Sequence, residues 1–245
     1  DPAEIAETAA LNNAYLVAVM ELICCTVQDP ESAEQLYSIN PIDKLFALLL
    51  TPVEADLKGA IFHAMAAIAK QVGERVVEEI WQYFERYQLL PTTNNSVGSD
   101  LRQNLNFVEA KVGRYATTDG FLALVDALLQ YGNPDSLGKG HRRPGILVYL
   151  EYIVQEVISK APGRYYAPDE NGDAQRWQLQ ARGYQCLRTV LRNYPIHIIH
   201  SPVAVNQNTS HGSSLSSFSL PSSQSSSSVL MIGVTCHTSH WRYPR

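Results

Sequence analysis

The chain has 245 residues and a formal net charge of -5 at neutral pH, with an isoelectric point near 5.8. This length is sufficient for one or two ordinary domains with a sizeable core. The mild acidity argues against nucleic-acid binding, because neutralising phosphates requires a basic face. The sequence contains no run of roughly 18 apolar residues that would span a bilayer, and no basic-then-apolar secretion signal at its start. Because the first residue is Asp1 rather than methionine, we expect an excerpt of a longer gene product.

Repeated helix-start signals separate the apolar stripes of the first 90 residues. Each signal combines a capping side chain with a proline, the residue best tolerated in the first helical turn. Four of them precede predicted helices: Asp1-Pro2, Asp29-Pro30, Asn40-Pro41 and Thr51-Pro52. Glu54 is spaced to close a capping box with Thr51. In the helix that follows, Ala60, Ala64 and Ala67 predict close contact with another helix.

The second half of the chain continues the helical pattern. A helix is predicted over residues 100–112, and Thr118 is expected to cap the next one, which carries Phe121 and Leu124. Pro144-Gly145 then opens a further helix, and the last predicted helix covers residues 174–193. Several aromatic and aliphatic residues recur at helical spacing and are interpreted as core: Trp81, Phe84, Trp177, Tyr184, Leu187 and Leu191.

These patterns predict an all-α fold. Residues 1–200 are interpreted as an irregular α-solenoid, that is, stacked antiparallel helix pairs that bury their apolar faces against one another. No strict sequence period indicates a regular repeat family. Residues 201–245 contain no acidic residue and are rich in serine. This tail is expected to be disordered, or to come from a wrongly predicted exon.

The loop from Gly132 to Pro144 contains glycines, a lysine and two arginines, which raises the question of a phosphate-binding loop. A Walker-type loop needs Gly-Lys followed by Ser or Thr and preceded by a buried strand. Here Lys139 is followed by Gly140, and a helical run precedes the loop. Gly132-Asn133-Pro134 is typical of a helix end. We therefore interpret the segment as an elbow between two helices.

The remaining candidates for chemistry do not assemble into a catalytic or metal site. His63 lies on an alanine-rich helix face and is interpreted as an interior or groove residue. The four cysteines, Cys24, Cys25, Cys186 and Cys236, lack metal-finger or disulfide spacing and are expected to be free thiols in a reducing compartment. The histidines of the C-terminal region lack a fourth ligand at familiar spacing. We expect no enzyme activity, no cofactor and no metal.

Residues 115–194 resemble the giant inner-ring scaffold nucleoporins of the nuclear pore, the nucleoporin 205/192 type with nucleoporin 188 as relative. The segment YATTDGFLALVDALL is similar to that family's Y-P-x-T-x-G-F-L-x-L-L pattern, and later positions are similar to its L-G-x-G-x-R-P-G, R-x-Y and K-W positions. The residues that carry the resemblance are Tyr115, Thr118, Gly120, Phe121, Leu122, Leu137, Gly138, Arg143, Pro144, Gly145, Tyr149, Tyr166 and Trp177. Ala116 and Val148 replace two prolines of the pattern. These departures weaken the assignment to one branch of the family more than the resemblance to the family as a whole.

The resemblance implies a structural role at the nuclear envelope. A scaffold of this type would bind linear segments of other inner-ring and linker nucleoporins in surface grooves and support nucleocytoplasmic transport, with no direct nucleic-acid contact and no membrane span. The alternative is another helical-repeat adaptor or transport-receptor-like module without catalysis. A regular repeat whose inner helices carry asparagine and acidic residues would favour that alternative, and the sequence does not contain one.

Overall fold

A computed structural model describes residues 2–90, 100–131, 137, 145–168 and 172–193. These ranges are almost entirely helical and contain no strand, which confirms the predicted all-α class. The helices are α1 (Pro2–Thr26), α2 (Pro30–Ser38), α3 (Pro41–Leu49), α4 (Ala55–Val72), α5 (Glu74–Tyr87), α6 (Leu101–Gln103), η1 (Asn104–Glu109), α7 (Ala110–Val112), α8 (Ala116–Gln130), α9 (Leu147–Glu151), η3 (Tyr152–Ile158), η4 (Ala161–Gly163) and α10 (Gly172–Asn193). η1 and η3 are π-helical.

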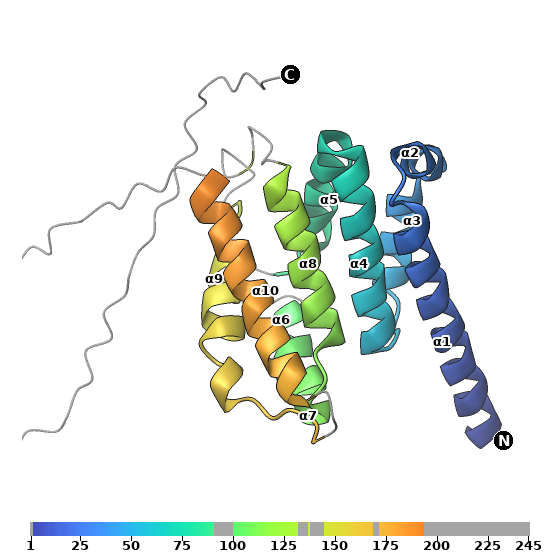
Figure 1. The fold of residues 1–245 in the computed structure, drawn as a ribbon. Helices are drawn as coiled ribbons and strands as arrows, with labels where there is room; N and C mark the ends of the chain where they lie inside the picture. Colours follow the sequence, from blue (N-terminus) through green and yellow to red (C-terminus); the bar gives the residue numbers. More distant parts are fainter. Residues whose placement is uncertain (1, 91–99, 132–136, 138–144, 169–171, 194–245) are drawn as a thin grey trace, which may run out of the picture. The chain divides into compact units, whose positions relative to one another are not determined.

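Residues 2–193 stack in two layers (Figure 1). Helices α1, α4, α8 and α10 lie side by side in one layer, and α3, α5 and α9 lie behind it. Within the first layer, α4, α8 and α10 run in the same direction. The Thr117 hydroxyl at the start of α8 donates to the carbonyl oxygen of Ala55 at the start of α4, and Asp119, one turn further along α8, contacts His63 in the middle of α4. Asp119 also contacts Arg182 on α10, while Asn193 at the end of α10 reaches Leu129 near the end of α8. The arrangement is the irregular α-solenoid that the sequence predicts.

Aromatic side chains fill the space between the layers. Phe62 and Phe121 lie edge to face with ring centroids 5.5 Å apart, and Trp81 lies 5.3 Å from Tyr149. These four rings and Phe84 are all buried. Edge-to-face packing adds stabilisation to the burial of large apolar surfaces. The predicted core positions Trp81 and Phe84 are therefore confirmed.

Helices α4 and α8 meet at their backbones. A side-chain carbon added at Gly120 would lie 2.3 Å from the carbonyl oxygen of Gly59, and one added at Gly59 would lie 2.4 Å from the carbonyl oxygen of Ala116. Both distances are shorter than the non-bonded contacts that Cβ atoms make in proteins, so only glycine fits at either position without moving the backbone. The predicted close helix contact therefore exists, but these glycines make it, whereas Ala60 and Ala67 face outward and remain half-buried.

Two predicted capping interactions differ in the structure. Helix α8 begins at Ala116, two residues before Thr118, and Glu109 on η1 provides its cap: one carboxylate oxygen accepts from the backbone N–H of Thr117 at 2.8 Å and of Thr118 at 3.2 Å. Helix α4 begins at Ala55, and Glu54 makes no side-chain capping bond. The prediction for Thr118 was wrong because the Glu109 side chain, from the preceding helix η1, caps α8 instead. The prediction for Glu54 was wrong because α4 begins three residues after the Thr51-Pro52 signal.

Of the other predicted start signals, Asp29 acts as a side-chain cap, whereas Asn40 makes no side-chain capping bond at the start of α3. The Asp29 side chain accepts from the Ser32 N–H at 2.8 Å at the start of α2. Asp100 accepts from the Arg102 N–H at 2.8 Å at the start of the predicted 100–112 helix, whose middle part is the π-helix η1. A carboxylate at this position satisfies N–H groups that have no partner within the helix.

The prediction that α10 buries its large residues was wrong. Trp177, Tyr184 and Leu191 have exposed fractions of 65%, 58% and 68%. They follow one another at seven-residue spacing on the side of α10 that faces away from α8, and Leu187 is only half-buried. The helix packs instead through Leu179, Gly183, Cys186 and Val190. The apolar stripe exists, but its large side chains stay mostly exposed, and the Arg176 guanidinium lies 5.7 Å from the centre of the Trp177 ring.

Candidate functional site

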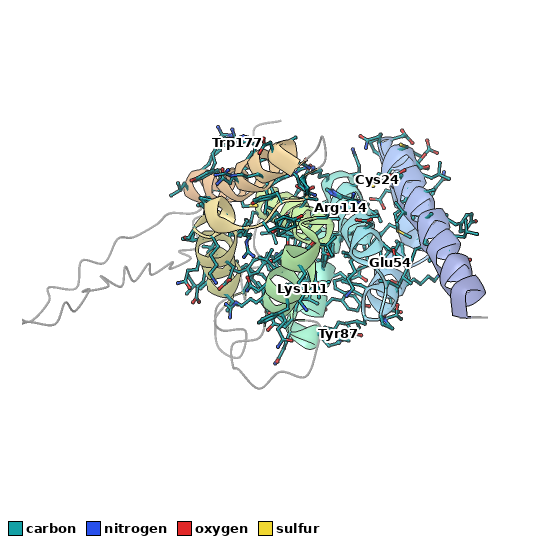
Figure 2. All side chains as sticks on the ribbon, turned by 90° about the horizontal axis from the view of Figure 1, so that it is seen from below. Cys24, Glu54, Tyr87, Lys111, Arg114 and Trp177 are labelled. Atoms are coloured by element: carbon teal, nitrogen blue, oxygen red, sulfur yellow. The ribbon has the colours of Figure 1, made fainter. Side chains whose placement is uncertain are left out.

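A groove runs along α4 on the exposed face of the first layer, with a volume of about 880 Å³. Residues of α4 and α8 form its floor, α1 forms one wall and α10 forms the other. Figure 2 looks at the molecule from below and shows Cys24 on the side of α1 that faces α4. We call this hollow, bounded by Asp56 and Gln71 along α4, the α4 groove.

Small residues make the floor of the α4 groove low. Gly59, Ala60 and Ala67 from α4 lie beside Ala116 and Ala123 from α8. Because Gly59 and Gly120 bring the two backbones together, α4 and α8 form one continuous floor. Side chains of one methyl group or less leave space that a partner's side chains can enter. The walls carry longer groups, among them Val17 and Cys24 on α1 and Leu179 on α10.

A charged network joins three helices in the middle of the groove. Asp119 lies 3.2 Å from Nε2 of His63 and 3.3 Å from Nε of Arg182. Burial raises the pKa of the Asp119 carboxyl, but the hydrogen bond from His63 and the Arg182 guanidinium outweigh burial and hold the pKa below its ordinary value. Asp119 is therefore ionised near neutral pH, and its charge is balanced within the groove.

A second carboxylate ties α8 to α10 beside the groove. Asp126 is buried and accepts hydrogen bonds from Gln185 at 2.6 Å and from the Thr189 hydroxyl at 2.7 Å on α10. It also accepts from Gln130 at 2.7 Å. Asp119 and Asp126 together fix α10 against α8.

Other polar groups of the groove are free to receive a ligand. Glu21, Asp56, Lys70 and Gln178 are exposed, and none of them makes a hydrogen bond or ion pair with another residue of the described ranges. Lys70 lies in the last turn of α4 and Asp56 in its first. The groove therefore has opposite, unpaired charges at its two ends.

The Cys24 thiol of the groove is a poor nucleophile. Burial, and then the neighbouring Cys25, raise the pKa of the Cys24 thiol above its ordinary value. The thiolate is the reactive form, and a raised pKa makes it scarcer. Cys24, Cys25 and Cys186 are free thiols, whereas Cys236 lies outside the described residues. Among the described residues, no group of three His, Cys, Asp or Glu side chains could hold a metal ion.

The first block of residues that carries the family resemblance organises the start of α8. The Tyr115 hydroxyl donates to the carbonyl oxygen of Tyr165 at 2.6 Å, which holds the segment before α10. Burial raises the pKa of Tyr115 to about 12, so it stays a donor. Thr118 donates its hydroxyl to Glu109, and Gly120 allows the approach of α4.

The remaining motif residues are divided between the core, the surface and the undescribed segments. Phe121, Leu122, Leu137 and Tyr149 are buried. Gly145 has a φ of +64°, a left-handed conformation that favours glycine. The Tyr166 hydroxyl donates to the carbonyl oxygen of Ala161 at 3.2 Å, and Trp177 is exposed on α10 (Figure 2). Gly138, Arg143 and Pro144 lie outside the described residues, as does most of the 132–144 elbow and the whole 194–245 segment.

Sequence reasoning missed Glu109, Gly59 and Asp126. Glu109 lies in an apolar helical pattern, where a lone acid looks like a surface residue, yet it is 1% exposed. A carboxylate eight residues before a Thr-Thr helix start is a signal that could have indicated it. Asp126 similarly sits in the apolar run of residues 121–129, and a charged residue amid such a run indicates a buried, bonded group.

A two-layer stack of helices that bury their faces against one another defines the α-solenoid class of protein architecture. Residues 3–234 match the model of the family described as "Nuclear pore complex scaffold, nucleoporins 186/192/205". The chain belongs to this family. The match includes the motif residues at 115–177 and most of the serine-rich segment.

Individual relatives agree with this assignment. The chain is 29% identical over 182 residues to "Nuclear pore complex protein Nup205" of Drosophila melanogaster, an alignment that covers 71% of this chain and 8% of the relative. It is 25% identical over 160 residues to the Homo sapiens Nup205, covering 63% of this chain and 8% of that protein. The Arabidopsis thaliana NUP205 is 29% identical over 136 residues. The chain thus spans less than a tenth of the length of these relatives.

No helix among the described residues is both long enough and apolar enough to cross a membrane.

Proposed function

We propose that this chain contributes a segment of α-solenoid to the scaffold of the nuclear pore at the nuclear envelope. In this role it holds linear segments of other nucleoporins and so supports nucleocytoplasmic transport. The observation that carries the proposal is the family match across residues 3–234, and the open α4 groove on a rigid stack supports it. No catalytic step and no cofactor are part of the proposed role.

A stacked layer of helices suits this role physically. Each helix is fixed by its neighbours, as α8 is by Gly59 on α4, Thr189 on α10 and Glu109 on η1. A surface built on such elements keeps its shape and loses little entropy when a flexible partner segment binds. The flexible partner segment loses conformational entropy when it orders on binding, whereas the surface of the scaffold is already formed.

The proposal is tested by tagging the endogenous protein with a fluorescent protein and following it in living cells. A stable scaffold component gives a punctate nuclear rim whose fluorescence recovers slowly after bleaching. A transport-receptor-like adaptor, the alternative class, would exchange rapidly and spread through nucleoplasm and cytoplasm. Diffuse fluorescence with rapid recovery would contradict the scaffold role.

A further inference from the structure

The dimensions of the α4 groove match one class of ligand. The groove follows α4 from Asp56 to Gln71, which corresponds to about 22 Å at the rise of an α-helix. A helix of that length, taken as a cylinder about 10 Å wide, has a volume of about 1,700 Å³. The groove volume of about 880 Å³ therefore accommodates roughly half of such a helix along its full length.

The chemistry of the walls favours a helical ligand over an extended one. All four elements around the groove, α1, α4, α8 and α10, are helices whose backbone groups bond within each helix. An extended segment would bring N–H and C=O groups that find no backbone partner there, and burying them unpaired is costly. A helical ligand satisfies its own backbone. Its aliphatic side chains would fit over Gly59, Ala60 and Ala67.

The direction of the ligand follows from the parallel helices. Because α4, α8 and α10 run the same way, their dipoles place partial positive charge at the Asp56 end of the groove and partial negative charge at the Gln71 end. A helix lying antiparallel to them aligns its dipole favourably. Its first turn then lies beside Lys70 and its last turn beside Asp56, the two unpaired charges of the groove ends.

We propose that the α4 groove binds an amphipathic α-helix of about four turns from another polypeptide, oriented antiparallel to α4, with acidic residues in its first turn and basic residues in its last. This charge order also stabilises the ligand helix itself. The middle of the ligand carries small and aliphatic side chains over the floor, because Asp119 is already paired with His63 and Arg182, and a basic or polar residue towards Glu21 on the α1 wall. The inference deepens the proposed scaffold function and rests on it.

The chain's own C-terminal segment does not fit this description. Residues 194–245 contain no aspartate or glutamate, so they cannot supply the acidic first turn. Residues 194–245 are therefore not the proposed occupant.

The test is a selection from a displayed library of peptides of about 16 residues, with a fixed Leu/Ala face and random polar positions, against the full chain. Selected peptides are synthesised and their affinities measured by fluorescence anisotropy. We expect helical peptides with acids first and bases last. Enrichment of proline-containing extended peptides, of the reverse charge order, or of no peptide would overturn the proposal.

Two sets of variants test where the peptide binds and in which orientation. Ala67→Trp fills the floor and is expected to weaken binding about tenfold or more, whereas Ala181→Trp, at an exposed position of α10 outside the groove, leaves it unchanged. Exchanging the end charges with Asp56→Lys and Lys70→Glu is expected to shift the preference roughly fivefold towards peptides of reversed charge order. Both charges are exposed, so this double variant folds even if Ala67→Trp does not. Unchanged preference would refute the orientation.

The location of the same variants in cells separates the two proposals. If the charge-exchanged protein still forms a nuclear rim while peptide binding fails to follow the charges, only the groove assignment falls. If the unaltered protein forms no rim, the scaffold role falls, whatever the peptides do.

Discussion

Gly59 on α4 and Gly120 on α8 lie against each other so closely that neither position has room for a side chain. A carbon added at Gly120 would approach the Gly59 carbonyl oxygen to 2.3 Å. The contact sits under the α4 groove and sets how tightly its two floor helices join. It explains why the family-like T-x-G pattern places a glycine inside a helix, where glycine is otherwise unfavourable.

The first prediction concerns this contact. Gly120→Ala should destabilise the fold by about 3 kcal/mol, because the backbones of α4 and α8 must move apart. Gly163→Ala is the matched control, since an added carbon there meets nothing within 4 Å, and it should change stability by less than about 0.5 kcal/mol. Urea denaturation of both variants measures the difference. Equal stabilities would show that the helices separate without cost.

The second prediction concerns the buried cap of α8. Burial raises the pKa of Glu109 to about 7, although hydrogen bonds from Thr118 and Thr117 lower it in part. An acid whose pKa is higher in the folded state contributes stability that is complete below its unfolded pKa of about 4.5 and is lost as pH rises through about 7. Glu109→Gln keeps an acceptor oxygen for the two N–H groups and cannot ionise.

The measurement is the difference in unfolding free energy between the Glu109→Gln variant and the unaltered chain as a function of pH. From about pH 5 to pH 8, the difference should shift in favour of the variant by on the order of 3 kcal/mol. A difference that is flat across this window would mean that Glu109 titrates normally. Glu109→Ala, which removes the cap altogether, should be less stable than Glu109→Gln by about 1–2 kcal/mol at every pH, and should show the same pH-dependent shift relative to the unaltered chain.

The third prediction concerns the network of Asp119 with His63 and Arg182. The pKa of Asp119 is held below its ordinary value in the folded chain. The ionised form of Asp119 therefore contributes stability above the unfolded pKa of about 3.8. This stability is lost as pH falls through the lower pKa of the folded state. Asp119→Asn should cost about 1–2 kcal/mol near neutral pH. The deficit should shrink at about pH 3. Glu151→Gln, an exposed acid on α9, serves as the control and should show no deficit.

The fourth prediction concerns the exposed apolar face of α10. Trp177→Ser and Leu191→Ser should change stability by less than about 0.5 kcal/mol, because both side chains are mostly exposed. Together they should reduce self-association in light scattering at rising concentration, because less apolar surface is exposed. By contrast, Trp81→Ser, at a fully buried position, should cost about 3–5 kcal/mol. A comparable loss for Trp177→Ser would show that α10 is covered.

Some local interactions could be predicted from the sequence, because they join residues only a few positions apart. Asp29 caps the helix that it precedes, although a similar signal at Asn40 gives no side-chain cap. Trp81 and Phe84 were identified as core because their spacing matches a helix face. The cap from Glu109 escaped notice because its N–H partners lie in another helix.

The sequence by itself determined that the chain is helical, where most helices begin, and which family its motifs resemble, because periodicity and capping depend on neighbours within a turn or two. The tertiary structure alone decided that Gly59 meets Gly120, that Asp119 and Asp126 join α10 to α8, and that Trp177 faces outward. A helical pattern indicates which face of a helix is apolar, but not which other helix covers that face. The neighbouring helix is determined by packing between residues about 60 positions apart. The groove along α4 results from this packing.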